Sequence, residues 1–255
     1  MKSLKKAFEI LEIFLDVEQS ELRLTDLAKE SGLKIATVNR IAAALVDSGY
    51  LSQPEKRGKY SLGPKLLYFA NVLKSKNPTR EIIRPYLLNL NSLVNESIAV
   101  FNFDGHKIYC VEDVASKHPL RIHLDPFGII PLYCSASGKI FLSNMKEQEL
   151  DKYFNSSDLQ AYTQNTITDL NAMKRHLVMV AQEGIAYIDE EFYVGVRSMA
   201  AGIRDTQGKY SSAVEILGPS VRLTRSRMIE ILPELKRCAS DIAKELGYRE
   251  KTISK

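Results

Sequence analysis

The first quarter of the chain places hydrophobic residues at helical spacing. Apolar positions recur every three or four residues between Leu4 and Leu15, which predicts an amphipathic first helix. A second helix is expected around residues 25–31, with Thr25 as its candidate N-cap. Gly32 can adopt the positive φ that ends a helix and turns the chain into the next one. This succession of short helices around a tight turn is typical of a helix-turn-helix.

The helix expected after this turn has two different faces. Its apolar positions, Val38, Ile41 and Leu45, share the side that we expect to pack against the core. The opposite side carries small or hydrogen-bonding residues close to the helix start: Ala36, Thr37, Asn39 and Arg40. Small residues let a helix approach base edges in the major groove, where Arg can bind guanine and Asn can bind adenine. The pattern therefore indicates a DNA-reading helix.

The segment YLSQPEKRGKYSLG predicts a β-hairpin directly after this helix, with strands at residues 50–53 and 59–62. Its turn is mostly basic because it contains Lys56, Arg57 and Lys59. A basic hairpin beside a helix-turn-helix is typical of a wing that lies along phosphates or in a minor groove. Together with Thr25 and the polar face of the third helix, these residues form the predicted DNA-binding set. The alternative is a winged-helix module that binds another protein and reads no DNA sequence.

Composition and charge agree with a globular protein that has a polyanionic partner. Of its 255 residues, 45% are hydrophobic and 26% are charged, and the net charge is +4. Residues 34–65 contain six basic and two acidic residues, whereas residues 76–255 contain 23 and 22. The positive charge is therefore concentrated beside the predicted reading helix. No apolar run reaches the ~18 residues of a membrane span, so we expect a cytoplasmic protein without membrane contact.

The pattern changes after the hairpin. Residues 64–75 predict a helix, and from residue 97 onward β-rich runs alternate with helical stretches. Hairpins are expected around Gly105 and Gly208, and further strands at residues 118–124 and 185–189. Helices are expected at residues 135–144, 146–154, 169–183 and 224–246. An antiparallel sheet flanked by helices, hence an α+β fold, follows from this order.

The segment SLKKAFEILEIF…LRLTDLAKESGLKIATVNRIAAALVDSGYLSQPEKRGKYSLGPKLL resembles the winged helix-turn-helix of IclR-type transcriptional regulators. Later segments, among them PLYCSASGKIFL, IDEEFYVGVRSMAAGIRD and ILGPSVRLT, are similar to that family's effector-binding domain. The resemblance implies a DNA-binding domain at residues 1–63, a linker helix at 64–78 and a GAF-like effector domain at 79–251. It also implies a dimer contact through the linker helix. One reading helix and a wing contact too few bases for genomic specificity, so we expect a homodimer or dimer of dimers on a pseudo-palindromic double-stranded operator.

Two residues at the start of the reading helix depart from the family. Ile35 and Ala36 stand where the family usually carries polar residues, which affects the operator sequence and leaves the DNA-binding role intact. Ile35 can contact a thymine methyl group or pack inward, and we favour inward packing.

The stretch CSASGK places small residues at a predicted helix start, where backbone N–H groups form an anion site. A small carboxylate can dock there against Ser135, Ala136 and Ser137, although an ordinary serine cap explains the same residues. The resemblance implies four further pocket residues: Ile188, Ser198, Glu215 and Leu217. A buried Glu215 needs a partner, which can be a ligand donor, Arg197, Arg204 or a proton. Asp189 is either a ligand contact or a solvated strand end.

These residues predict an effector that is a small organic acid with hydrogen-bond donors, such as a hydroxylated sugar acid. We expect no enzyme, since a triad of Ser135 or Ser137 with a histidine and Asp189 lacks the G-x-S-x-G elbow. No cofactor and no metal are expected, because the histidines and the three cysteines do not converge in sequence. A metal at His123 with Asp189 or Glu215 remains an alternative. The predicted function is a ligand-responsive DNA-binding regulator, specifically a repressor.

Overall fold

The computed structural model describes residues 2–17, 19–55, 58–75, 78–105, 107–123, 130–157 and 159–249. The chain divides into two compact units, Met1–Asn77 and Pro78–Lys255, and each is described by itself. No helix in the described ranges has the length and the apolar character needed to cross a membrane.

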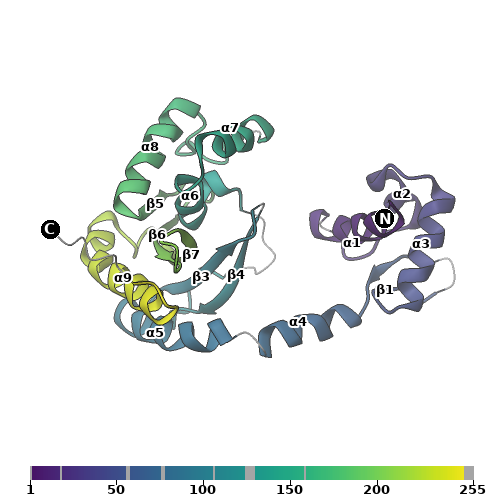
Figure 1. Cartoon of the computed structure of the whole chain (residues 1–255), viewed down its shortest axis with the longest axis horizontal. Coiled ribbons are helices and arrows are strands. Elements are labelled where there is room, and N and C mark those ends of the chain that lie inside the picture. Colours follow the sequence, from purple (N-terminus) through teal and green to yellow (C-terminus); the bar gives the residue numbers. More distant parts are fainter. Residues whose placement is uncertain are drawn as a thin grey trace. The chain divides into compact units, whose positions relative to one another are not determined.

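The first unit begins with three helices and a short hairpin, and α4 (Lys65–Ser75) follows them among its described residues (Figure 1). The helices are α1 (Lys2–Asp16), α2 (Leu24–Ser31) and α3 (Ile35–Asp47), and the strands are β1 (Leu51–Ser52) and β2 (Ser61–Leu62). The two strands pair antiparallel, with Leu51 opposite Leu62. Ile10, Leu27 and Val38 are completely buried and bring the three helices together. The predicted helix-turn-helix with a wing is confirmed.

The start of α2 differs from the prediction. The helix begins at Leu24, so Arg23 is the N-cap residue and Thr25 already lies inside the first turn. The carboxylate of Asp26 accepts a hydrogen bond from the backbone N–H of Arg23 at 2.9 Å. An acid at the third helical position can accept a hydrogen bond from the backbone N–H of the N-cap residue in this way, which stabilises a helix that starts at Leu24. Gly32 ends the helix with φ of 63°, as expected.

A separate helix, α4 (Lys65–Ser75), follows the hairpin. Its apolar side chains are largely uncovered, since Leu67 is 67% exposed and Tyr68 is 71% exposed. Phe69 is half exposed and stacks on Tyr50, with ring centroids 6.0 Å apart. The helix predicted at residues 64–75 is therefore present as α4, and its exposed side is apolar.

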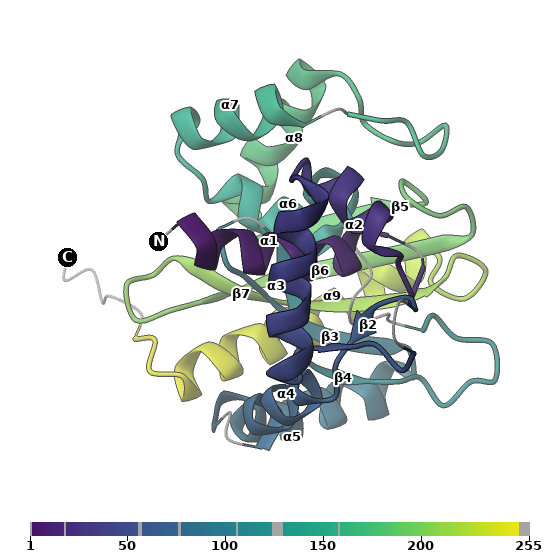
Figure 2. The same ribbon diagram turned by 90° about the vertical axis from the view of Figure 1, so that its right-hand side faces the viewer.

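The second unit is built on a five-stranded antiparallel sheet in the order β4-β3-β7-β6-β5. The strands are β3 (Ser97–Phe103), β4 (Ile108–Val114), β5 (Ile185–Asp189), β6 (Val196–Arg204) and β7 (Tyr210–Pro219). Helices α5 (Pro78–Val94) and α9 (Arg225–Glu245) cover one face (Figures 1 and 2). The other face carries α6 (Ala136–Ser143), with α7 (Glu147–Ser156) and α8 (Leu170–Glu183) beyond it. The predicted α+β class is confirmed.

Three helices of this unit start where a side chain can cap them. Ser135 accepts a hydrogen bond from Gly138 N at 3.0 Å, and Asp169 accepts one from Ala172 N at 2.6 Å. Thr224 does the same for α9. Each cap satisfies a backbone donor that the helix leaves unpaired. The capping residues therefore predicted where these three helices start.

The strand expected at residues 118–124 is wrong for its described part, residues 118–123, which is irregular. Side chains rather than a strand ladder hold this segment. Ser97 Oγ donates to the carbonyl of Ile122 at 2.8 Å, and Ser116 Oγ accepts from His118 N at 3.1 Å. The alternating apolar residues therefore belong to an irregular segment that is held by side-chain hydrogen bonds and is not a strand of the sheet.

Candidate functional site

The outer face of α3 presents the residues predicted to read DNA. Ala36, Asn39 and Arg40 are exposed, and Thr37 is half-buried. Positions 36 and 40 lie one helical turn apart on the same side. The opposite side is fixed because Val38, Ile41 and Ala42 are buried in the core of this unit. The helix thus holds a small residue and two hydrogen-bonding side chains on a free surface.

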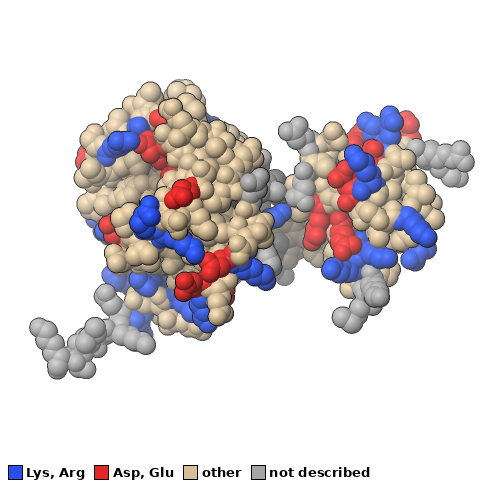
Figure 3. Space-filling view, turned by 90° about the horizontal axis from the view of Figure 1, so that it is seen from above, with Lys and Arg blue, Asp and Glu red and all other residues tan. Residues whose placement is uncertain are grey.

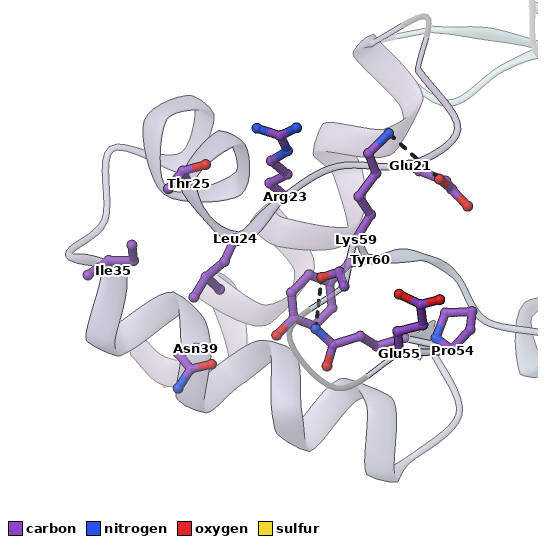
Figure 4. Close-up of a pocket in the computed structure, with 12 residues that line it drawn as sticks. Glu21, Arg23, Leu24, Thr25, Ile35, Asn39, Pro54, Glu55, Lys59 and Tyr60 are labelled. Atoms are coloured by element: carbon purple, nitrogen blue, oxygen red, sulfur yellow. Dashed lines mark hydrogen bonds and ion pairs between the residues drawn. The ribbon is translucent and has the colours of Figure 1, made fainter.

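Ile35 does not pack inward, so that prediction is wrong. Its side chain is 50% exposed at the first position of α3. The buried residues of this helix begin at Val38, and Ile35 in the first turn lies outside the core of this unit. Figure 4 shows Ile35 and Asn39 beside a hollow that Thr25 also borders.

This hollow lies between the start of α2, α3 and the hairpin, and has a volume of about 890 Å³. Arg23 and Lys59 line it on the side opposite Ile35 (Figure 4). Arg23 was not among the sequence candidates, although a basic residue just before a helix start is the signal that marks it. Gln53 Nε2 donates to the carbonyl of Gly58 at 3.0 Å and joins the two arms of the hairpin on its turn side. The predicted residues Lys56 and Arg57 lie outside the described residues.

Charges of both signs border the hollow. Lys59 Nζ lies 3.9 Å from Glu21 Oε2, and both side chains are about half exposed. Figure 3 shows basic and acidic side chains interspersed over one face of this unit, with no single uniform basic field. Attraction to phosphate must therefore come from individual basic side chains more than from an electrostatic potential that is positive over the whole surface.

We expect Lys59→Ala to weaken binding to every DNA sequence by a similar factor. Losing one phosphate contact should reduce the slope of log affinity against log salt by about 1. The measurement is fluorescence anisotropy with labelled duplexes at several KCl concentrations. Lys244→Ala, which removes an exposed charge from α9, is the matched control and should leave the slope unchanged. A loss confined to certain base sequences would contradict the phosphate role.

A second candidate site is a cavity in the other unit, between the start of α6 and the sheet, with a volume of about 140 Å³. Six of the predicted effector residues line it: Ser135, Ser137, Ile188, Ser198, Glu215 and Leu217. Ala136 is completely buried and is not part of the lining. Asp189 is not part of it either.

The strand register explains why four of these residues meet. Ile188 is paired with Ser198, and Ser198 is paired with Leu217 on the next strand. Glu215 is two positions from Leu217 and so points to the same side of the sheet. Sequence reasoning did not name the other wall residues. Cys134, Phe192, Tyr193 and Val196 lie within the segments that carried the resemblance, and the rest come from other parts of the chain: Phe101, Ile108, Tyr109, Cys110, Ile122, His123 and Ile130.

Glu215 is only 2% exposed, and its carboxyl group lies at the N-terminus of α6. The backbone N–H of Ser137 donates to Oε2 at 3.0 Å. Burial raises the pKa of Glu215, while hydrogen bonding by the hydroxyls of Ser198 and Ser137 and by the backbone of Ser137 and Ala136 opposes the rise. Helix dipole and amide donors are therefore the partner that the buried acid required.

The two arginines considered as partners are engaged elsewhere. Arg197 Nε donates to Asp189 Oδ1 at 2.5 Å, and Arg225 binds the other oxygen of the same carboxylate. Arg204 donates to the Gly208 carbonyl at 2.6 Å. The Arg197 hydrogen bond, with that of Arg225, holds the pKa of Asp189 below its usual value. Asp189 therefore links β5, β6 and α9 outside the cavity.

A buried ion pair ties α6 to the loop after β5. Lys139 Nζ lies 2.6 and 2.8 Å from the two carboxylate oxygens of Glu191. Lys139 is completely buried and Glu191 is 6% exposed. Burial lowers the pKa of Lys139 and raises the pKa of Glu191, and each partner opposes the shift of the other. The same loop supplies Phe192 and Tyr193 to the cavity wall, so the pair positions that wall.

Within the described ranges, no group of three or more His, Cys, Asp or Glu side chains is placed to hold a metal ion. The sequence alternative of a metal at His123 therefore gains no geometric support from these residues.

Comparisons with known proteins match both units. The IclR helix-turn-helix domain matches residues 3–55, and the bacterial transcriptional regulator IclR C-terminal domain matches residues 71–244. The transcriptional repressor IclR of Escherichia coli (strain K12) is 27% identical over 250 residues, covering 97% of this chain and 90% of its own. The DNA-binding transcriptional repressor YiaJ of the same organism is 31% identical over 233 residues, covering 88% and 81%.

Solved structures agree over the whole chain. A transcriptional regulator from Rhodococcus sp. RHA1 has 29% identity and a TM-score of 0.77, covering 96% of this chain and 98% of its own. The Thermotoga maritima IclR structure has 26% identity and a TM-score of 0.68, covering 97% and 100%.

Proposed function

Because the chain belongs to the IclR family of ligand-responsive, DNA-binding transcriptional regulators, we propose that it represses its targets by placing α3 in the major groove of a pseudo-palindromic operator. Both relatives described above are repressors by name, which supports repression over activation. The relatives are regulators of transcription, and the hydrolase alternative finds no counterpart among them.

The observation that carries this proposal is the free outer face of α3. The small side chain of Ala36 lets the helix backbone come close to the bases, and Asn39 and Arg40 are exposed about one turn further along the helix. Asn can bind adenine and Arg can bind guanine through two hydrogen bonds each. Ile35, uncovered at the helix start, adds an apolar contact for a thymine methyl group.

A labelled duplex tests this function. We expect dissociation constants of about 10⁻⁸ to 10⁻¹¹ M for a specific site at physiological salt, and a steep loss of affinity with added salt. A winged-helix module for protein partners is the alternative, and it would bind every duplex weakly and without sequence preference.

We further propose that the protein binds as a homodimer, or as a dimer of dimers, through α4. One reading helix contacts too few base pairs for genomic specificity, so two must act together. The exposed apolar side chains of α4, including Leu67 and Tyr68, supply a surface that a second copy can cover.

Replacing Tyr68 by glutamate should convert the dimer to a monomer and weaken operator binding at least tenfold. The side chain is 71% exposed in the single chain, so the change should not disturb its folding. Analytical ultracentrifugation gives the mass, and circular dichroism checks the fold. Val178→Glu on α8 is the matched control, since this apolar residue is also more than half exposed. A Tyr68→Glu dimer as tight as wild type would remove α4 from the interface.

The effector is proposed to enter the cavity of the second unit and to favour one arrangement of the paired α3 helices. Support comes from the lining, which includes the four residues that the family resemblance implies for the pocket together with Ser135 and Ser137 from the start of α6. The sequence predicted a small carboxylate effector that binds the backbone N–H groups at the N-terminus of α6. The carboxyl group of Glu215 occupies that position.

A further inference from the structure

We propose that the effector presents a hydroxyl or amino donor to Glu215 from a largely apolar, single-ring-sized body, and that the cavity disfavours carboxylates. The inference rests on the proposed function, which places the effector in this cavity. It replaces the small organic acid expected from the sequence.

The first step is that the α6 anion site is already taken. Glu215 Oε2 accepts from Ser137 N at 3.0 Å, and the Ala136 backbone also donates to this carboxyl group. The neighbouring N–H groups are used within the chain, since Gly138 N donates to Ser135 Oγ and Lys139 N donates to the Ser135 carbonyl. A ligand carboxylate would therefore have to displace the protein's own.

The charge of the cavity lining also disfavours a carboxylate ligand. Among its described residues there is no Lys or Arg, and Glu215 is the acid. Burial raises the pKa of Cys110 and of Cys134 to about 12, so both thiols are neutral at physiological pH. Histidine and tyrosine complete the ionisable lining, as His123, Tyr109 and Tyr193. A carboxylate would lose its hydration beside another carboxyl group, and no Lys or Arg side chain among the described lining residues would compensate for that loss.

The third step is the size and polarity of the space. Its volume of about 140 Å³ is close to the ~150 Å³ of a cavity that accepts benzene. Apolar side chains, among them Phe101 and Leu217, form most of its wall. Polar atoms gather near Glu215, where the Ser198 hydroxyl hydrogen-bonds the carboxyl group. The Ser137 hydroxyl also acts on the pKa of this carboxyl group, and its buried Oγ has no hydrogen-bond partner of good geometry among the described residues. A ring with one donor satisfies this arrangement.

The first test compares three probes that share one ring: benzyl alcohol, benzylamine and benzoate. Titration calorimetry on the full chain measures each affinity, and thermal denaturation gives an independent readout. We expect the alcohol and the amine to bind at least tenfold more tightly than benzoate. Equal behaviour of all three probes, including three failures to bind, would overturn the inference.

The second test removes the internal carboxyl group. Glu215→Ala leaves the amides of Ala136 and Ser137 without their acceptor, so benzoate and propionate should bind the variant at least tenfold more tightly than wild type. A variant that gains no affinity for either carboxylate would show that Glu215 does not block an anion site. Glu215→Gln preserves size, in case the alanine variant does not fold. It should lose any preference for benzylamine over benzyl alcohol that wild type has, whereas a retained preference would contradict a role for the carboxylate.

DNA binding by the wild-type chain, measured in parallel, distinguishes a failure of the effector inference from a failure of the proposed DNA-binding function. Specific DNA binding together with failed probe predictions would overturn this inference alone. Absence of specific DNA binding would overturn the proposed function, whatever the probes do.

Discussion

Replacing Arg40 by alanine is expected to weaken specific DNA binding by about 1–3 kcal/mol and to relax the preference at one base pair of each half-site. The side chain is exposed on α3, one turn after Ala36, where a guanidinium group can reach a guanine edge. Competition titrations check this result, using a duplex that the wild-type chain selects and its single-base-pair variants. Only the position that Arg40 contacts should lose its preference.

The control for this variant is Arg175→Ala, which removes an exposed arginine from α8 in the other unit. It should leave both affinity and base preference unchanged. An equal loss on all duplexes by Arg40→Ala would reassign the side chain to a phosphate contact. No loss at all would remove it from the interface.

Replacing Lys139 by methionine is expected to lower the free energy of unfolding of the second unit by about 3–5 kcal/mol. The change leaves the carboxylate of Glu191 buried without its cationic partner, and a buried unpaired charge is costly. Urea denaturation followed by circular dichroism measures the loss. Probe binding in the cavity should also weaken, because Phe192 and Tyr193 lie on the loop that this pair holds.

The double variant Lys139→Met, Glu191→Leu separates the pair from simple packing. Removing both charges should restore most of the stability, since apolar replacements of a buried pair are often neutral. Lys174→Ala is the comparison for an exposed pair. Its partner Asp151 lies 2.6 Å away, with both side chains more than a third exposed. That change should cost about 1 kcal/mol or less. A double variant as unstable as Lys139→Met alone would contradict the account.

The parts of the fold that were predictable are those governed by local rules. The buried stripe of α3 follows from apolar residues at positions 38 and 41, and the hairpin of β3 and β4 follows from the turn at Gly105. Ser135, Asp169 and Thr224 mark helix starts because a cap is a contact between near neighbours in the chain.

The parts that were missed depend on contacts between distant residues. The sequence indicated an anion site at the start of α6 and a buried acid at Glu215 that needed a partner. It could not indicate that each satisfies the other, because Ser137 and Glu215 are 78 residues apart in the chain. The Lys139–Glu191 pair was missed for the same reason. Ile35 and residues 118–123 were misjudged because hydrophobicity alone does not reveal whether a core lies nearby.

The central claim is that paired α3 helices read a DNA sequence. Its most direct measurement is selection from a pool of random duplexes by the full chain, followed by sequencing of the bound fraction. We expect two inverted half-sites whose centres lie a whole number of helical turns apart, ~10 base pairs per turn. Recovery of no preferred sequence at any salt concentration that permits binding would contradict it.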